Sequence, residues 1–424
     1  MAQLLRERAP PASGKRPSSS ASSATSGPVA CAPVEPYRRI TLAVGLAMFV
    51  DASLYLAILP LLPHYAHEFG LGTLGVALVL SAYPAATPVV SIACIPLVPR
   101  IGARRIALAS GLVMTVATIA FAFAPNAAVL IAARFVQGIA SGTVWTSSMS
   151  WVTHNAPPER RGRESGIVMG MLSAGSIAGP GVGALAAWAG SAPAFLIVAV
   201  VSLVGVAVTA AAPAGTPVER ERDLWSSARS VLRQPFARAA MLVAVLDTVA
   251  FGAIDLLVPR SLDDLGASTA AIAAAFTVGA VLGMFAGPVG GRLVDRIGAH
   301  RVAPKAALLI ALSPLPLAFG LPAWAQLGML VVIGPIFAVA AAAMYPLGSS
   351  GADSAGVGHI VVSGLMGASW ATGFTSAPLV AGAVAGSAGR GAAFAVASIL
   401  CLPLLALIVA ATRAPAPVLG PPRS

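Results

Sequence analysis

The chain contains few charged residues. Asp, Glu, Lys and Arg make up only 10% of its 424 residues, whereas hydrophobic residues make up 57%. Soluble domains carry about 25% charged residues, so this shortage excludes an ordinary soluble domain and predicts a membrane protein. Lysine is nearly absent, because Lys15 and Lys305 are the only lysines among the 26 basic residues.

Cysteine, histidine and catalytic motifs are also scarce. Cys31, Cys94 and Cys401 are odd in number and far apart, which excludes a disulfide framework or a cysteine zinc site. None of the five histidines has the spacing of a metal-binding pair. The chain lacks a phosphate-binding glycine loop with Lys, a zinc-binding helix motif and a nucleophile elbow. We therefore expect no enzyme activity, no cofactor, no bound metal and no ATP-driven pump.

A series of long apolar runs fills most of the chain. Each run is about 20 residues long, which is the length of a helix that spans a bilayer. The twelve runs are 40–62, 73–97, 105–124, 127–151, 165–188, 191–212, 238–259, 269–291, 303–320, 325–347, 358–385 and 391–412. They predict an all-α membrane protein of twelve transmembrane helices, arranged as two six-helix bundles over residues 38–213 and 238–412.

The segments outside the two bundles are polar. Residues 1–37 are rich in Ser, Ala and Pro and cannot bury a core, so we expect a disordered tail there and a second tail at 413–424. The loop at 214–237 holds most of the charge in the middle of the chain. It is predicted to be either a short amphipathic segment on the membrane surface or a solvated linker.

The two halves carry the same landmark residues 196 positions apart. Asp51 falls on Asp247, and further along Gly102 falls on Gly298. The second pair lies in a basic turn that reads PRIGARR in the first half and DRIGAHR in the second. A repeat of this length in an apolar chain predicts two similar, pseudo-symmetric bundles, an arrangement typical of transporters.

The basic residues are unevenly distributed between the loops. The predicted spans place 23 of the 26 Lys and Arg residues on one side of the membrane. Cytoplasmic loops carry an excess of Lys and Arg, so both termini are predicted to be cytoplasmic in a multi-pass protein of the cell membrane. The net charge of +11 follows from this bias, and we expect no nucleic-acid partner.

Two motifs resemble those of the major facilitator superfamily. The sequence from Gly291 to Arg301, GRLVDRIGAHR, resembles the family's loop signature, and Arg134 followed by Gln137 and Gly138 resembles its fourth-span motif. The glycines of the fifth span resemble those of the twelve-span drug:proton antiporters. The resemblance implies the fold of this superfamily and secondary transport by alternating access.

The basic turns are the first candidate gating elements. Gly298 allows a tight reversal, and Asp295 is expected to pair with Arg or cap a helix and so latch one closed state. In the first copy Pro99 stands in place of this acid, so its arginines are expected only to fix the topology. The alternative is that all of these charges are topological. The candidates are Gly291, Asp295, Arg296, Gly298, Arg301, Arg100, Gly102 and Arg105.

The fifth predicted span is the second candidate gating element. Gly175, Gly179 and Gly183 share one helix face and permit close helix approach, while Pro180 favours a kink. We expect this face to lie at the seam between the two halves, where it would support rocking or stop proton leakage. Glycine-rich packing without any role in coupling is the alternative.

Four charged residues fall inside predicted spans and away from their first three residues. Each costs about 2.5–3.5 kcal/mol to insert at the bilayer centre, so such residues usually face a cavity and have a function. The resemblance implies that helices 1, 4, 7 and 10 line that cavity, which would gather Asp51, Arg134, Asp247 and Asp255. We expect Asp51 or Asp247 to exchange the coupled proton. The alternatives are structural pairing for both, a place at the outer interface for Asp255 and a purely structural role for Arg134.

Aromatic and polar residues near these charges are candidates for binding the substrate. Aromatic faces with a few acids suit lipophilic cations through cation–π contacts. Ordinary helix packing is the alternative for each of them. The candidates are Tyr55, Gln137, Trp145, Phe251, Tyr345, Met366 and Trp370.

These observations predict proton-coupled efflux of small amphipathic or cationic compounds, such as drugs. The expected partners are a small-molecule substrate, protons and the lipid bilayer, and a monomer is expected. Uptake of a small metabolite by the same fold is the alternative. A receptor or scaffold without transport would not need acids at matched positions within the membrane.

Overall fold

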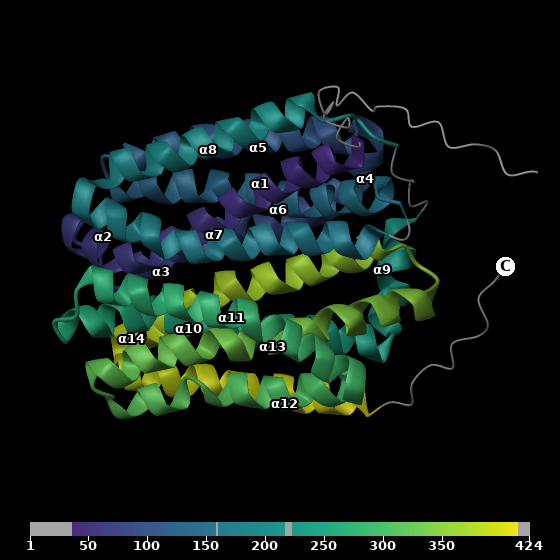
Figure 1. The fold of residues 1–424 in the computed structure, drawn as a ribbon. Coiled ribbons are helices and arrows are strands. Elements are labelled where there is room, and N and C mark those ends of the chain that lie inside the picture. Colours follow the sequence, from purple (N-terminus) through teal and green to yellow (C-terminus); the bar gives the residue numbers. More distant parts are fainter. Residues whose placement is uncertain (1–35, 158–159, 217–222, 414–424) are drawn as a thin grey trace, which may run out of the picture. The chain divides into compact units, whose positions relative to one another are not determined.

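In the computed structural model, every regular element that the structure describes is a helix (Figure 1). The described residues are 36–157, 160–216 and 223–413. The described residues belong to one compact unit. Nearly all of the two predicted tails, and residues 217–222 of the predicted central loop, lie outside the described residues.

The six spans predicted in the first half are helical. The first span breaks beyond Ala57, where Pro60 and Pro63 start short helices, and the second breaks before Pro88. Proline lacks a backbone N–H and is favoured in the first turn of a helix, which explains these restarts. The elements are α1 Pro36–Ala57, η1 Leu59–Leu61, α2 Leu62–Glu68, α3 Thr73–Ala85, α4 Thr87–Ile101, α5 Ala103–Ala122, α6 Ala127–Asn155, α7 Arg161–Ala189 and α8 Ser191–Ala211.

The spans predicted in the second half are also helical. The last two predicted spans are two helices that share the label α14 and meet at a kink at Gly389, where the backbone is non-helical with φ 87° and ψ 163°. The described residues therefore contain eleven helices that are long and apolar enough to cross a membrane, and the last of them holds two predicted spans. The elements are α9 Leu224–Arg233, α10 Pro235–Asp264, α11 Thr269–Ile297, α12 Ala299–Leu312, η3 Leu315–Phe319, α13 Ala323–Ala355 and α14 His359–Thr412.

The repeated basic turns have the same backbone conformation. Gly102 has φ 94° and ψ 136°, and its repeat equivalent Gly298 has φ 87° and ψ 142°. Only glycine adopts such angles readily, so these residues let α4 turn into α5 and α11 into α12 without a loop. The repeat read from the sequence is thus also a repeat of local structure.

The two halves contact each other through equivalent helices. Within each half, α1 packs on α7 and α10 packs on α14. Between the halves, α3 and α4 pack on α14, while α11 packs on α7. Since α11 is the repeat equivalent of α3 and α4, the two contact regions correspond to each other.

The glycine face of α7 packs inside the first half and not at the seam. A Cβ atom on Gly175 would lie 2.2 Å from the carbonyl oxygen of Phe49, and one on Gly183 would lie 2.3 Å from that of Ala57. Both partners are in α1. The prediction that these glycines face the seam is therefore wrong, because the four-residue spacing selects a helix face and not the neighbour of that face. Pro180 lies inside α7, which is continuous from Arg161 to Ala189.

Segment 223–233 of the predicted central loop contains a helix, α9, with one buried face. Asp223 caps its start, because its Oδ1 accepts hydrogen bonds from the backbone N–H groups of Trp225 and Ser226, both at 3.1 Å. Val231 is fully buried, whereas the Trp225 side chain is exposed. The helix contacts α10, α13 and α14, so it is packed on the second half.

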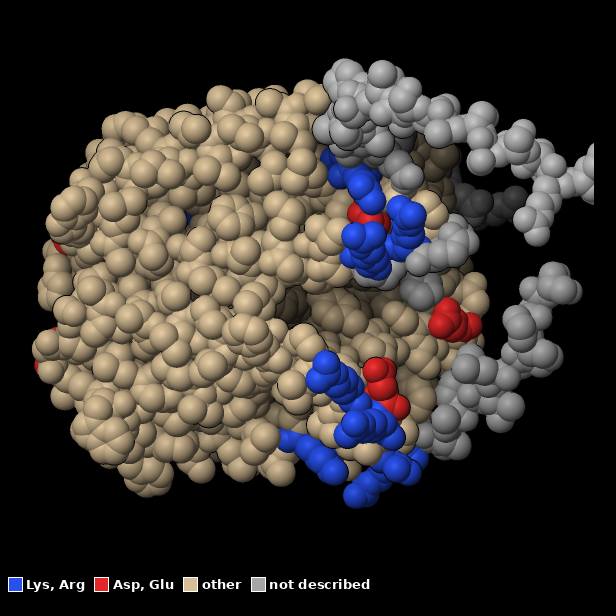
Figure 2. All heavy atoms as spheres, viewed as in Figure 1, with Lys and Arg blue, Asp and Glu red and all other residues tan. Residues whose placement is uncertain are grey.

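Basic side chains gather at one end of the helices. Figure 2 shows them in two groups, with the surface hollowed between them. Arg100 and its repeat equivalent Arg296 lie in the last turns of α4 and α11. At the opposite end Arg390 instead pairs with Asp264 at 2.7 Å.

Candidate functional site

Asp51 is buried between three helices of the first half. Its side chain is 5% exposed. The hydroxyl group of Tyr83 on α3 donates to Oδ1 at 2.6 Å, and the indole N–H of Trp145 on α6 donates to Oδ2 at 2.8 Å. Ser141 on α6 is also within hydrogen-bonding reach. This acid is therefore held in place by α3 and α6, and the predicted cavity residue Trp145 contacts it directly.

Arg134 lies on the other side of the same tyrosine. The guanidinium carbon is 4.3 Å from the centroid of the Tyr83 ring, a cation–π contact. Its Nη1 donates to the Leu54 carbonyl oxygen at 3.0 Å and to Gln137 Oε1 at 3.3 Å. Tyr83 thus touches Asp51 with its hydroxyl group and Arg134 with its ring face. Within the described residues no direct ion pair joins Asp51 and Arg134.

Arg134 keeps unused hydrogen-bonding capacity. The residue is 1% exposed, and its Nε and Nη2 atoms have no hydrogen-bond partner among the described residues. Gln137 is fixed in turn, because its amide nitrogen donates to Thr118 Oγ1 at 3.2 Å. The predicted pair Arg134 and Gln137 is therefore brought together beside Asp51.

The acids of α10 are more deeply buried and less well satisfied. Asp247 is 2% exposed and Asp255 is 0% exposed. Oδ1 of Asp247 and both carboxyl oxygens of Asp255 lack a hydrogen-bond partner among the described residues. Asp247 is the repeat equivalent of Asp51, so equivalent positions carry the same acid in different surroundings. A buried carboxylate without partners is costly, which makes both residues candidates for a proton or a ligand.

An aromatic cluster joins the two halves next to Asp51. Tyr55 on α1 lies 5.7 Å from Tyr83, 6.0 Å from Trp370 and 5.2 Å from Phe374, measured between ring centroids. Phe251 on α10 lies 6.4 Å from Phe374. The hydroxyl group of Tyr55 has no partner among the described residues. Three of the predicted residues, Tyr55, Phe251 and Trp370, are therefore in one cluster.

Two predicted cavity residues lie outside this aromatic cluster. Tyr345 on α13 is 48% exposed and makes no ring contact with the described aromatic residues. Met366 is buried in a separate apolar cluster, with its sulfur close to Gly348. Conversely, the sequence analysis missed Tyr83 and Phe374. A tyrosine in the middle of an apolar span was the available signal for Tyr83.

The candidate latch is not formed in this structure. Asp295 is exposed and has no ion pair among the described residues, and Arg296 and Arg301 are also exposed. Arg100 and Arg105 of the first copy are exposed as well. The charged turns therefore face solvent at the end where the surface is hollowed (Figure 2).

The composition of the site also limits its chemistry. The described residues contain no group of three His, Cys, Asp or Glu side chains that could hold a metal ion. The site combines one hydrogen-bonded acid, one arginine, two incompletely satisfied acids and an aromatic cluster. Such a set can bind protons, cations and aromatic or amphipathic molecules.

Comparison with known families decides the class of the protein. The profile of the Major Facilitator Superfamily matches residues 44–362. The chain belongs to the Major Facilitator Superfamily. Members of this superfamily are transporters and not enzymes, so the chain is a multi-pass membrane protein that carries out secondary transport, as predicted.

The chain is similar in sequence to several transporters of this superfamily. The chain is 23% identical to the MFS-type transporter ppzB of Metarhizium majus over 349 residues, which cover 65% of this chain and 74% of that protein. It is 36% identical to the human vesicular acetylcholine transporter over 124 residues, which cover 26% of this chain and 23% of that protein. The chain spans only 30% of the length of the ppzB protein of Metarhizium rileyi.

A solved structure confirms the fold. The crystal structure of a bacterial homologue of the human lysosomal transporter Spinster, in an inward-facing and unoccupied conformation, superimposes with a TM-score of 0.71. The superposition covers 90% of this chain and 98% of that chain at 14% sequence identity. The predicted fold of this superfamily is thus confirmed.

Proposed function

We propose that this transporter exports small cationic or amphipathic molecules in exchange for protons, and that Asp51 exchanges the proton. The observation that carries the proposal is the position of Asp51. It is buried, it accepts hydrogen bonds from Tyr83 and Trp145, and it lies next to an aromatic cluster shared by both halves. An acid in such a place has a function by default.

The hydrogen bonds define where a proton can bind. The indole N–H of Trp145 can only donate, so Oδ2 of Asp51 stays an acceptor. The hydroxyl group of Tyr83 can either donate or accept. A proton on Oδ1 is therefore accommodated when Tyr83 turns its own hydrogen away and accepts from the carboxyl group. Oδ1 is the oxygen at which Asp51 takes up and releases a proton.

The aromatic cluster provides the contacts for a cationic substrate. The rings of Tyr55, Trp370 and Phe374 lie 4.4–6.0 Å apart, and aromatic faces attract ammonium groups. The carboxyl group of Asp255 also lies within the span without a hydrogen-bond partner among the described residues, so its oxygens are available to a cationic substrate. The similarity to vesicular acetylcholine transporters supports a substrate of this class, because acetylcholine is a quaternary ammonium compound.

We further propose that the two halves, residues 38–213 and 238–412, move against each other as six-helix bundles. The end with the basic residues is assigned to the cytoplasm of the cell by the positive-inside rule. The protein is proposed to act as a monomer. Asp295 and the basic turns would then meet when that end closes.

The test is transport in proteoliposomes that contain the purified full chain. An imposed proton gradient is expected to drive ethidium against its concentration gradient. The Asp51→Asn variant is expected to abolish this driven transport. Asp264→Asn removes an acid at the opposite end, where it pairs with Arg390, and serves as the matched control. Asp247→Asn and Asp255→Asn show whether a second acid is required.

Three outcomes would count against the proposal. Driven transport that persists undiminished in the Asp51→Asn variant would remove Asp51 as the proton site. If driven transport is undiminished in the Asp247→Asn variant as well, proton exchange by Asp51 or Asp247 is rejected. Accumulation of the substrate together with protons would support the alternative, uptake of a small metabolite.

A further inference from the structure

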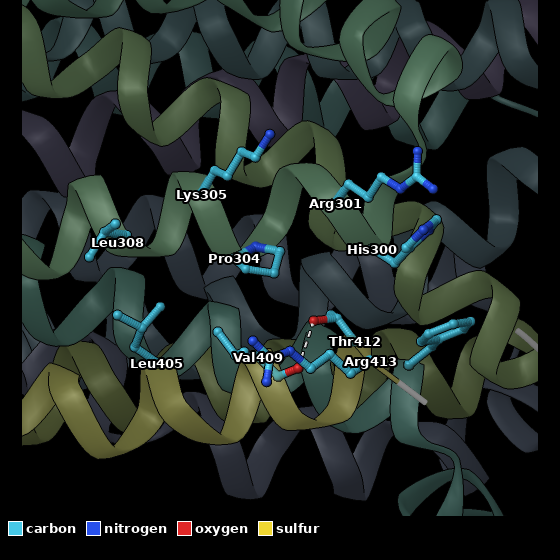
Figure 3. A pocket seen from close by; sticks show the side chains of 10 residues that line it. His300, Arg301, Pro304, Lys305, Leu308, Leu405, Val409, Thr412 and Arg413 are labelled. Atoms are coloured by element: carbon cyan, nitrogen blue, oxygen red, sulfur yellow. Dashed lines mark hydrogen bonds between the residues drawn. The ribbon is translucent and has the colours of Figure 1, made fainter. Parts of the chain in front are cut away.

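A groove of about 750 Å³ lies at the basic end of the second half, away from the site just described. Its walls are α12 and the last two turns of α14, and Phe236 at the start of α10 also lines it. Figure 3 shows Arg301, Lys305 and Leu308 along α12 and Leu405 and Arg413 along α14. Nothing in the proposed transport cycle uses these residues as a set.

Positive charge is concentrated at one end of this groove. Arg301, Lys305 and Arg413 line it and are exposed, and His300 lies beside them. None of the three cations has a carboxylate within 4.0 Å among the described residues. The lining also contains no Asp or Glu. The groove therefore offers three unneutralised cations to a negatively charged ligand.

The corresponding region of the first half is bridged by a side chain. There Arg104 crosses from α5 to the end of α8 and donates to the carbonyl oxygens of Thr209 and Ala210. The repeat equivalent of Arg104 is His300, which instead stacks on Phe236 with ring centroids 6.4 Å apart. The side chain that fills the first half is thus missing in the second.

The same comparison explains the charge. The repeat equivalent of Lys305 is Ala109, so a lysine has been placed where the first half has a methyl group. Lys305 is the only lysine among the residues that the structure describes. In Figure 3 its side chain runs toward the end of the groove occupied by Arg301.

The other end of the groove is apolar. Leu308 is 44% exposed, and together with Leu405 and Pro304 it forms a surface that continues toward the apolar middle of α12 and α14. A ligand that fills both ends needs an anionic group and a hydrocarbon part. Basic pockets between transmembrane helices are typical sites for the headgroups of anionic lipids.

We propose that this groove binds an anionic phospholipid, with its phosphate between Arg301, Lys305 and Arg413 and its acyl chains along Leu308 and Leu405. A soluble phosphate compound has the same anionic group but would leave the apolar end empty. Charge complementarity together with the exposed Leu308 and the half-buried Leu405 therefore favours the lipid as the occupant.

The test measures the thermal stability of the purified full chain in detergent. Phosphatidylglycerol is added, with phosphatidylcholine of the same acyl chains and glycerol 1-phosphate in parallel samples. Phosphatidylglycerol alone is expected to raise Tm. Each surface cation contributes about fivefold to binding. The triple variant Arg301→Gln, Lys305→Gln, Arg413→Gln is therefore expected to raise the half-saturating concentration of phosphatidylglycerol by about 100-fold.

The matched control removes three exposed arginines at the same end but outside the groove. Arg38→Gln, Arg39→Gln, Arg163→Gln is expected to keep the Tm shift. The variant Arg301→Lys, Arg413→Lys keeps the charge and is expected to retain binding, which guards against a simple folding defect. An equal loss in the control triple, an undiminished shift in the groove triple, or an equal shift with glycerol 1-phosphate would each overturn the proposal.

Discussion

His67 and Asp263 occupy equivalent positions in the two repeats and contact each other. The imidazole Nε2 lies 3.0 Å from the carboxyl Oδ2, and the residues are 196 positions apart. A residue and its repeat equivalent can meet only close to the axis that relates the two halves. The contact therefore joins the halves at that axis, at the end opposite the basic turns.

This contact is expected to bias the structure toward closure of that end. Asp263→Asn removes the carboxylate that contacts His67, and because the contact is exposed it contributes about 0.2–1 kcal/mol. Separation of the halves there should become up to about fivefold more populated. Spin labels at Gly72 and Leu265 in a cysteine-free background would measure this as a larger fraction of long distances.

Asp264→Asn is the control for this measurement. Asp264 pairs with Arg390 of the same half, so its loss should leave the distance distribution unchanged. If both variants shift the distribution equally, general charge at this end and not the contact at the axis is responsible.

A glycine substitution tests the close packing of α1 on α7. Gly175→Ala would place a methyl group 2.2 Å from the backbone oxygen of Phe49, which must then move. Such overpacking costs about 1–3 kcal/mol, so the midpoint of thermal unfolding should fall. In the same helix Gly181→Ala meets no atom within 4 Å and should be neutral or slightly stabilising. Equal Tm values for the two variants would contradict the packing.

The hydroxyl group of Tyr83 offers a test that leaves the arginine contact in place. Tyr83→Phe removes the donor to Asp51 and keeps the ring face for Arg134. Hydrogen bonds to charged groups contribute about 1.5–3 kcal/mol, so proton-driven transport should fall by about tenfold or more. Substrate exchange without a gradient should change little, because it does not need proton release.

Tyr55→Phe is the matched control for the loss of this hydroxyl group. The Tyr55 hydroxyl has no partner among the described residues, so its removal breaks no hydrogen bond. Similar losses of driven transport in both variants would point to packing of the cluster, and not to the bond with Asp51.

The cap of α9 should make this helix sensitive to acid. Hydrogen bonds, chiefly from the backbone N–H of Ser226, lower the pKa of Asp223 below its ordinary value. The cap therefore stabilises α9 fully above the ordinary pKa of about 3.9, and this stabilisation is lost as the pH falls through the lowered value. Protection of the Trp225 and Ser226 amides against hydrogen exchange should fall in that range.

In the Asp223→Ala variant, the Trp225 and Ser226 amides should be weakly protected against hydrogen exchange, to the same extent at every pH. Asp295→Ala, at another exposed acid, should leave these amides unchanged. Protection of the wild-type amides that does not vary below the ordinary pKa would exclude a role for the carboxylate.

The positions of the spans could be predicted because bilayer thickness fixes the length of an apolar helix. The same hydropathy pattern could not show how the last two spans are joined, since the turn at Gly389 is made by one glycine and no polar loop. The repeat was also readable, and the matched angles of Gly102 and Gly298 are its structural counterpart.

The site was only partly predictable. A charge in an apolar run identifies itself, which is why Asp51 and Arg134 were found. Tyr83 was missed, because its role depends on how α3 packs on α1 and α6, and an uncharged side chain carries no comparable signal. The predicted neighbour of the α7 glycines was wrong for the same reason. Helix periodicity shows which residues share a face, whereas packing between distant segments decides which helix lies against that face.

Tyr83 contacts both Asp51 and Arg134, two described residues that form no direct ion pair with each other. Under the proposed mechanism, each proton that Asp51 takes up raises the local charge by one unit, while the arginine stays ionised. The added positive charge then repels a cationic substrate. Under the proposed mechanism, this mutual exclusion would suppress slippage, in which the proton and the substrate are carried together or protons cross without moving substrate.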